Sequence, residues 1–98
     1  MKITVKRTGG FAGLTENITD LDTSQLESGT AEKVAAKVRK IGFFDFPEVV
    51  AAGAVGADMY QYEVTVTDGP RHHSVTFPEG APEAAPLLDL VQTLEKIK

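Results

Sequence analysis

The chain has 98 residues, of which 42% are hydrophobic and 24% are charged. This length provides for one hydrophobic core, and this composition is typical of a folded domain and excludes a disordered chain. The net charge of −4 means that phosphate backbones and anionic membrane surfaces repel the chain, so we expect it to bind neither nucleic acid nor membrane.

The chain contains no cysteine, and from its second position the N-terminal segment alternates apolar with polar or charged side chains. A secretory signal would instead begin with a continuous apolar run of at least about seven residues. A transmembrane helix needs roughly 18 apolar residues in a row, and no stretch approaches this. We therefore expect a cytoplasmic protein without disulfide bonds.

The first predicted elements are two strands that form a hairpin. Residues 2–7 place Ile3 and Val5 on one face and polar side chains on the other, which is the alternation of a strand. Residues 9–13 include three glycines and predict a turn. Alternation resumes over residues 14–18, so we expect this segment to pair with the first strand.

A polar stretch and a helix follow the hairpin. Residues 20–29 are polar and rich in turn formers, and we expect turns there. Thr30 is a residue type that begins helices, and Gly42 stands where a helix C-cap is expected. Between them, apolar side chains recur at helical spacing. The members of this stripe are Val34, Val38 and Ile41.

The second half of the sequence predicts another hairpin and another helix. Residues 59–67 alternate most clearly, with valine and tyrosine on one face. Residues 68–71 predict a four-residue loop rather than the tightest hairpin turn, and residues 72–77 predict the partner strand. A helix follows the proline-rich stretch 78–86. Its apolar stripe consists of Leu87, Leu90 or Val91, Leu94 and Ile97.

The element order is therefore ββαββα. Two hairpins of this kind join edge to edge in a four-stranded antiparallel sheet with one apolar face, and two amphipathic helices cover that face. We expect one α+β domain over residues 1–98.

No combination of side chains indicates catalysis. His72 and His73 are adjacent in a predicted strand, so their side chains leave opposite faces and cannot hold one metal ion together. The run Asp20-Leu21-Asp22 suggests a calcium loop, but Gln25 and Ala31 stand where that loop requires glycine and glutamate. Phosphate-binding and nucleophile motifs are absent. We expect no enzyme, no metal and no cofactor.

Two segments have a composition that is unusual for loops. Residues 9–14 carry the aromatic Phe11 at a glycine-rich turn, and residues 49–57 form a run of nine residues without a charge. Long apolar loops of this kind often bind partners, while burial in the core is the alternative. Small residues let backbone approach a partner closely. The candidate contact residues are Gly9, Gly10, Phe11, Ala12, Gly13, Leu14, Gly53, Val55 and Gly56.

Several segments together carry a resemblance to a known family. Residues 8–14 (TGGFAGL) follow a basic first strand, and residues 43–47 (FFDFP) follow the first helix. The strand pair is DMYQYEVTV, from residue 58, and HSVTF, from residue 73, and the last helix opens with PLL. In this order and spacing, the segments resemble the emfourin family over nearly the whole chain.

This resemblance implies a protein inhibitor of thermolysin-like zinc metalloproteases, with the protease as its partner. The candidate contact residues would then occlude the active-site cleft of the protease with backbone loops. One alternative is a non-catalytic protein-interaction module without a protease target. Another is a carrier that holds a small apolar ligand between the sheet and the helices.

Overall fold

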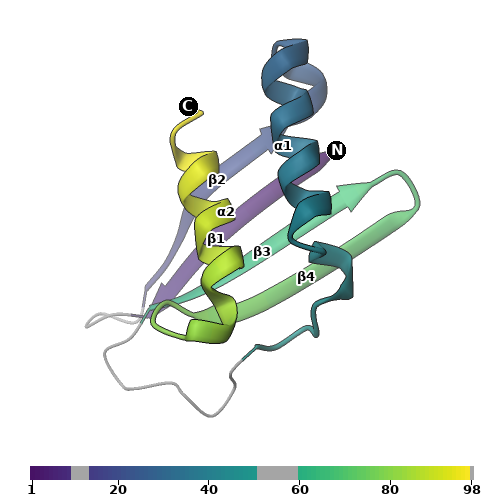
Figure 1. The fold of residues 1–98 in the computed structure, drawn as a ribbon. Helices are drawn as coiled ribbons and strands as arrows, with labels where there is room; N and C mark the ends of the chain where they lie inside the picture. Colours follow the sequence, from purple (N-terminus) through teal and green to yellow (C-terminus); the bar gives the residue numbers. More distant parts are fainter. Residues whose placement is uncertain (10–13, 51–59, 98) are drawn as a thin grey trace.

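The computed structural model describes residues 1–9, 14–50 and 60–97. These residues form a four-stranded antiparallel sheet and two α-helices in the order ββαββα (Figure 1). The strands are β1 (Lys2–Gly9), β2 (Leu14–Asp22), β3 (Tyr60–Asp68) and β4 (Arg71–Pro78), and the helices are α1 (Ser28–Lys40) and α2 (Ala85–Glu95). The predicted α+β architecture is confirmed.

The two hairpins join through their first strands, so the sheet order is β2-β1-β3-β4. The register places side chains of one kind in rows across the sheet. Val5, Val64 and Val75 lie opposite one another on three neighbouring strands, and each is fully buried. Because strand alternation sends every second side chain to one face, these rows form the apolar face that the sequence predicts.

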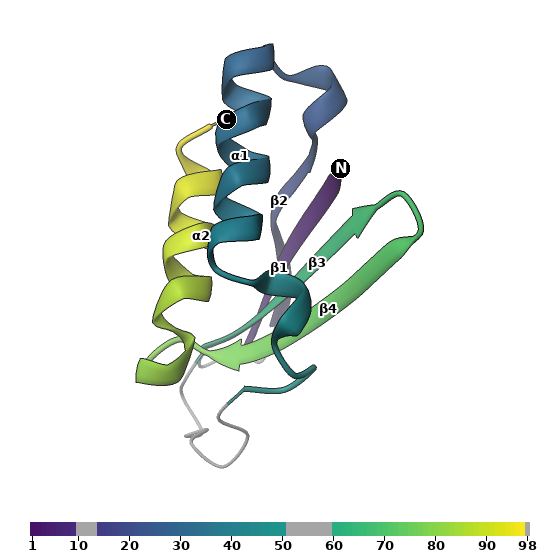
Figure 2. The same cartoon turned by 45° about the vertical axis from the view of Figure 1, so that its right-hand side comes forward.

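Both helices lie on that face of the sheet (Figure 2). Helix α1 buries Val34 and Val38, and Lys37 on the same helix donates a hydrogen bond to the Asp89 carboxylate of α2. Helix α2 is the more apolar of the two, and its buried residues are Leu87, Leu90, Val91 and Leu94. The predicted stripes are confirmed within both helices, while Ile41 and Ile97 lie just after the helices and pack partly buried against the core. Among the described residues, no helix is long and apolar enough to cross a membrane.

The predicted polar, turn-rich stretch over residues 20–29 is shorter than expected, because a strand and a helix extend into it. Strand β2 continues to Asp22, a 3₁₀ turn covers Thr23–Gln25, and α1 begins at Ser28, with Thr30 inside the helix. Asp20 and Asp22 lie opposite Thr4 and Lys2, so they point to the open face of the sheet, where an aspartate stays solvated. Strand β2 continues through Asp20 and ends at Asp22, whose carboxylate accepts hydrogen bonds from the Ser24 amide and hydroxyl and caps the 3₁₀ turn.

The second hairpin is tighter than predicted. Asp68 pairs with Arg71, which leaves a loop of two residues, Gly69 and Pro70, rather than four. Gly69 has a φ of +60°, and two-residue hairpin loops need this conformation at their first position. Gly42 after α1 also has a positive φ, of +69°, which confirms the predicted C-cap.

Candidate functional site

Both flanks of the first predicted contact segment and the residue Tyr60, which follows the second, meet at one end of the sheet. Gly9, the last residue of β1, pairs with Leu14 of β2 on one side and with Tyr60 of β3 on the other (Figure 1). Gly9 has a φ of +111°, a conformation that favours glycine. Gly9, Leu14 and Tyr60 therefore lie side by side on three neighbouring strands.

Most of the candidate contact residues lie outside the part of the chain that the structure describes. Residues 10–13 include Gly10, Phe11, Ala12 and Gly13, and residues 51–59 include Gly53, Val55 and Gly56. Gly9 and Leu14 are the candidates that the structure places. The contact role of all nine residues stays a prediction.

Leu14 is exposed at the end of the sheet. Its exposed fraction is 65%, and Val49, at 53%, is the other large apolar side chain exposed among the described residues. A leucine at this position adds little to the core, because most of its surface remains in water. Leu14 is therefore available to a partner.

An arginine lies beside Leu14 on the helix side of the sheet. An Nη atom of Arg7 lies 2.9 Å from an Oε atom of Glu16, and the guanidinium carbon is 4.3 Å from the centre of the Tyr60 ring. The Glu16 carboxylate, followed by the Tyr62 hydroxyl, raises the pKa of Arg7 above its ordinary value. The sequence interpretation missed this cluster, although a signal exists: Arg7 continues the inward row of Ile3 and Val5.

The segment of residues 49–57 begins as an addition to the sheet. The Val50 amide donates to the Thr76 carbonyl at 2.9 Å, and the Thr76 amide donates to the Glu48 carbonyl at 2.8 Å. Residues 48–50 thus run along the outer edge of β4. Val50 is buried while Val49 is exposed, so the start of this segment places one valine in the core and leaves its neighbour open to a partner.

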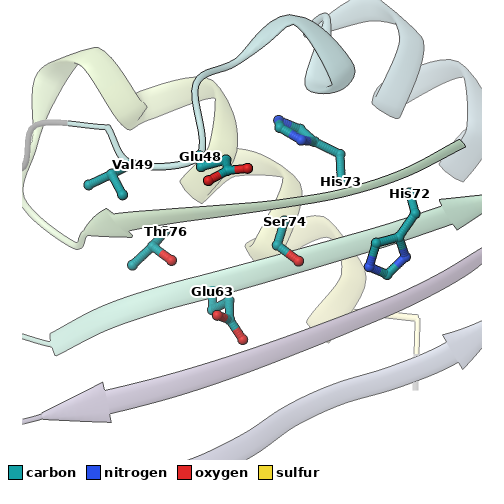
Figure 3. A pocket seen from close by; sticks show the side chains of 7 residues that line it. All are labelled: Glu48, Val49, Glu63, His72, His73, Ser74 and Thr76. Atoms are coloured by element: carbon teal, nitrogen blue, oxygen red, sulfur yellow. The ribbon is translucent and has the colours of Figure 1, made fainter.

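A polar hollow lies where this segment meets the sheet (Figure 3). It is lined by Glu48, Val49, Glu63, His72, His73, Ser74 and Thr76. The two histidine side chains leave β4 in different directions, as predicted: His72 Nδ1 is 2.8 Å from Thr67 Oγ1, and His73 Nε2 is 2.6 Å from the Phe46 carbonyl oxygen. Within residues 1–9, 14–50 and 60–97, no three histidines or carboxylates are grouped as a metal ion would require.

Comparison with protein families gives one match. A family model described as Emfourin matches residues 5–95, which include all four strands and both helices apart from the first residues of β1. No curated protein and no solved structure matches the chain.

Proposed function

The chain belongs to the Emfourin family, and from this premise we propose that it is a protein inhibitor of thermolysin-like zinc metalloproteases. The inhibitor acts by filling the active-site cleft of the protease with the two segments that leave one end of the sheet. It has no catalytic role, and its partner is the protease itself.

The observation that carries this proposal is the shared anchorage of the two segments. A protease cleft is shaped to hold extended peptide, so an inhibitor must present narrow projecting chain to it. Gly9, Leu14 and Tyr60 are paired neighbours, which brings both ends of the first segment and the chain that follows the second segment to one place. Residues 10–13 and 51–57 contain no charge, so neither carries a charged side chain that binding would desolvate.

The apolar side chains of these segments supply candidates for a specificity pocket. Phe11, Leu14 and Val55 are the side chains we assign to this role, and Leu14 is largely exposed. Aromatic and aliphatic anchors that enter a pocket at the centre of an interface contribute most of the binding free energy. Loss of one such anchor should weaken inhibition by about 2 kcal/mol or more, which is roughly thirtyfold.

The experiment is a titration of the pure protein against a thermolysin-like protease and against proteases of unrelated mechanism. We expect inhibition of the former alone. Phe11→Ala and Val55→Asp should raise the inhibition constant while the melting temperature stays near that of the parent. If both variants inhibit as well as the parent, the contact surface lies elsewhere. If the parent inhibits no thermolysin-like protease, a protein-interaction module with another partner is the better account.

A further inference from the structure

We propose that Arg7 is a positioning residue that holds the anchor points of the two contact segments against each other. This inference rests on the proposed function, because it assigns Arg7 a part in the same inhibitory surface. Arg7 need not touch the protease. It acts through Glu16 and Tyr60, which belong to the strands that carry the two segments.

The geometry joins three strands through one side chain. Arg7 lies in β1, directly opposite Glu16 of β2 and Tyr62 of β3. Its guanidinium binds the Glu16 carboxylate at 2.9 Å and lies over the ring of Tyr60, 4.3 Å from the centre. Glu16 follows Leu14 by two residues, and Tyr60 is the first described residue after the second segment. One planar cation therefore contacts the base of both segments.

Other side-chain contacts described at this end of the sheet span fewer strands. Gly9, the residue between the two anchor points, has no side chain with which to hold either. On the opposite face, Thr8 and Thr15 share a hydrogen bond of 3.0 Å, but this bond joins only β1 and β2. The pairing of Gly9 with Leu14 and with Tyr60 sets the spacing of the three strands. The Arg7 contacts add to this pairing at the strand ends, where local opening costs the least free energy.

The requirements of the core do not explain an arginine at this position. The preceding members of its row, Ile3 and Val5, are apolar and fully buried. Arg7 also buries its Nε atom without a hydrogen-bond partner among the described residues, and a buried donor of this kind reduces stability. An apolar side chain would serve the core as well. The arginine is explained by what its guanidinium reaches, namely Glu16 and Tyr60.

The consequence for inhibition is pre-organisation. Segments whose bases are fixed lose less conformational entropy when they enter the cleft. Without the guanidinium, the strand ends at Leu14 and Tyr60 open more often, and binding must order them. We expect Arg7→Gln to raise the inhibition constant about tenfold or more.

The chain supplies a matched control at the other end of the sheet. Arg71 also pairs with a carboxylate, that of Asp68 at 3.3 Å, and its guanidinium carbon is 4.2 Å from the centre of the Phe44 ring. Arg71→Gln therefore removes the same two kinds of contact, an ion pair and a cation–π contact, far from the candidate contact segments. Arg7→Lys keeps the charge but loses the planar group, and we expect it to restore part of the inhibition.

The test measures two quantities for each variant at a temperature well below its melting point. The first is the inhibition constant against a thermolysin-like protease. The second is amide hydrogen exchange over residues 14–16 and 60–62, which reports the motion of the two anchor points without any protease. The proposal predicts that Arg7→Gln weakens inhibition and speeds exchange in both stretches, and that Arg71→Gln does neither.

Two results would overturn the proposal. In one, Arg7→Gln and Arg71→Gln both inhibit like the parent. In the other, Arg7→Gln inhibits poorly but exchange is unchanged, which would make Arg7 a direct contact. If Arg7→Gln does not fold, the inhibition constant and the hydrogen exchange are both measured on Arg7→Lys instead. A parent that fails to inhibit contradicts the proposed function, while the exchange data still decide whether Arg7 fixes the anchor points.

Discussion

Replacing Leu14 by alanine separates a contact role from a structural one. Full burial of a leucine side chain is worth about 1.5–3 kcal/mol. Leu14 is 65% exposed in the free protein, so roughly two-thirds of that free energy, about 1–2 kcal/mol, remains to be gained in a complex. We therefore expect Leu14→Ala to raise the inhibition constant about five- to thirtyfold. The free energy of unfolding should fall by only about 0.5–1 kcal/mol, because little of the side chain is buried.

The assay is the inhibition of a thermolysin-like protease, read together with a denaturant titration of each protein. Ile97→Ala is the control, because it removes a partly buried aliphatic side chain that follows α2. The C-terminal end of α2 lies away from the end of β1 that precedes the first contact segment (Figure 1). This control should lose stability and keep its inhibition constant. Inhibition by Leu14→Ala within twofold of the parent would refute the assignment of Leu14 to the contact surface.

Three further predictions address the core, the hollow and the response to acid. Val64→Ala, in the middle of a buried row, should lower the free energy of unfolding by about 2–3 kcal/mol because burial is lost and a cavity remains. Glu63→Ala, on the open face, should change it by less than about 0.5 kcal/mol. Denaturant midpoints in the reverse order would show the strand register to be wrong. His72→Ala should change the inhibition constant by less than about tenfold, and a stoichiometric metal ion lost on this substitution would contradict the account of the hollow. The hydrogen bond from Lys37 lowers the pKa of Asp89 in the folded state. The stabilising effect of this bond is therefore present above the ordinary pKa of about 4 and is lost as the pH falls through the lowered value. Asp89→Asn should lose less stability than the parent between about pH 5 and pH 2, which thermal melts would show.

Most of the fold follows from periodicity, because each strand and helix has one face in the core. Strand β3 and both helical stripes could be read directly from alternation and helical spacing. Strand β2 could be read only over residues 14–18, because a register shift opposite Val5 and Lys6 interrupts its alternation beyond them. The order of the strands also lies beyond periodicity, since it depends on which hairpin edges pair.

The candidate site was predictable in its segments but not in its surroundings. Glycine content and the lack of charge selected residues 9–14 and 49–57 from composition alone. Arg7 was missed although it continues the row of Ile3 and Val5, and its contact with Tyr60 depends on the pairing of β1 with β3 across the sequence. The edge pairing of Val50 with Thr76 is equally non-local. Contacts between distant segments require the register of the sheet, which a single sequence does not contain.

The central claim is that the protein occupies the active-site cleft of a thermolysin-like protease. The most direct measurement is the dissociation constant between protein and protease at increasing concentrations of a small ligand bound to the catalytic zinc. If the loops fill the cleft, the apparent dissociation constant should rise in proportion to the ligand concentration, because the protein and the ligand cannot occupy the protease at the same time. An unchanged dissociation constant at saturating ligand would show that the protein binds outside the cleft, and would contradict the account.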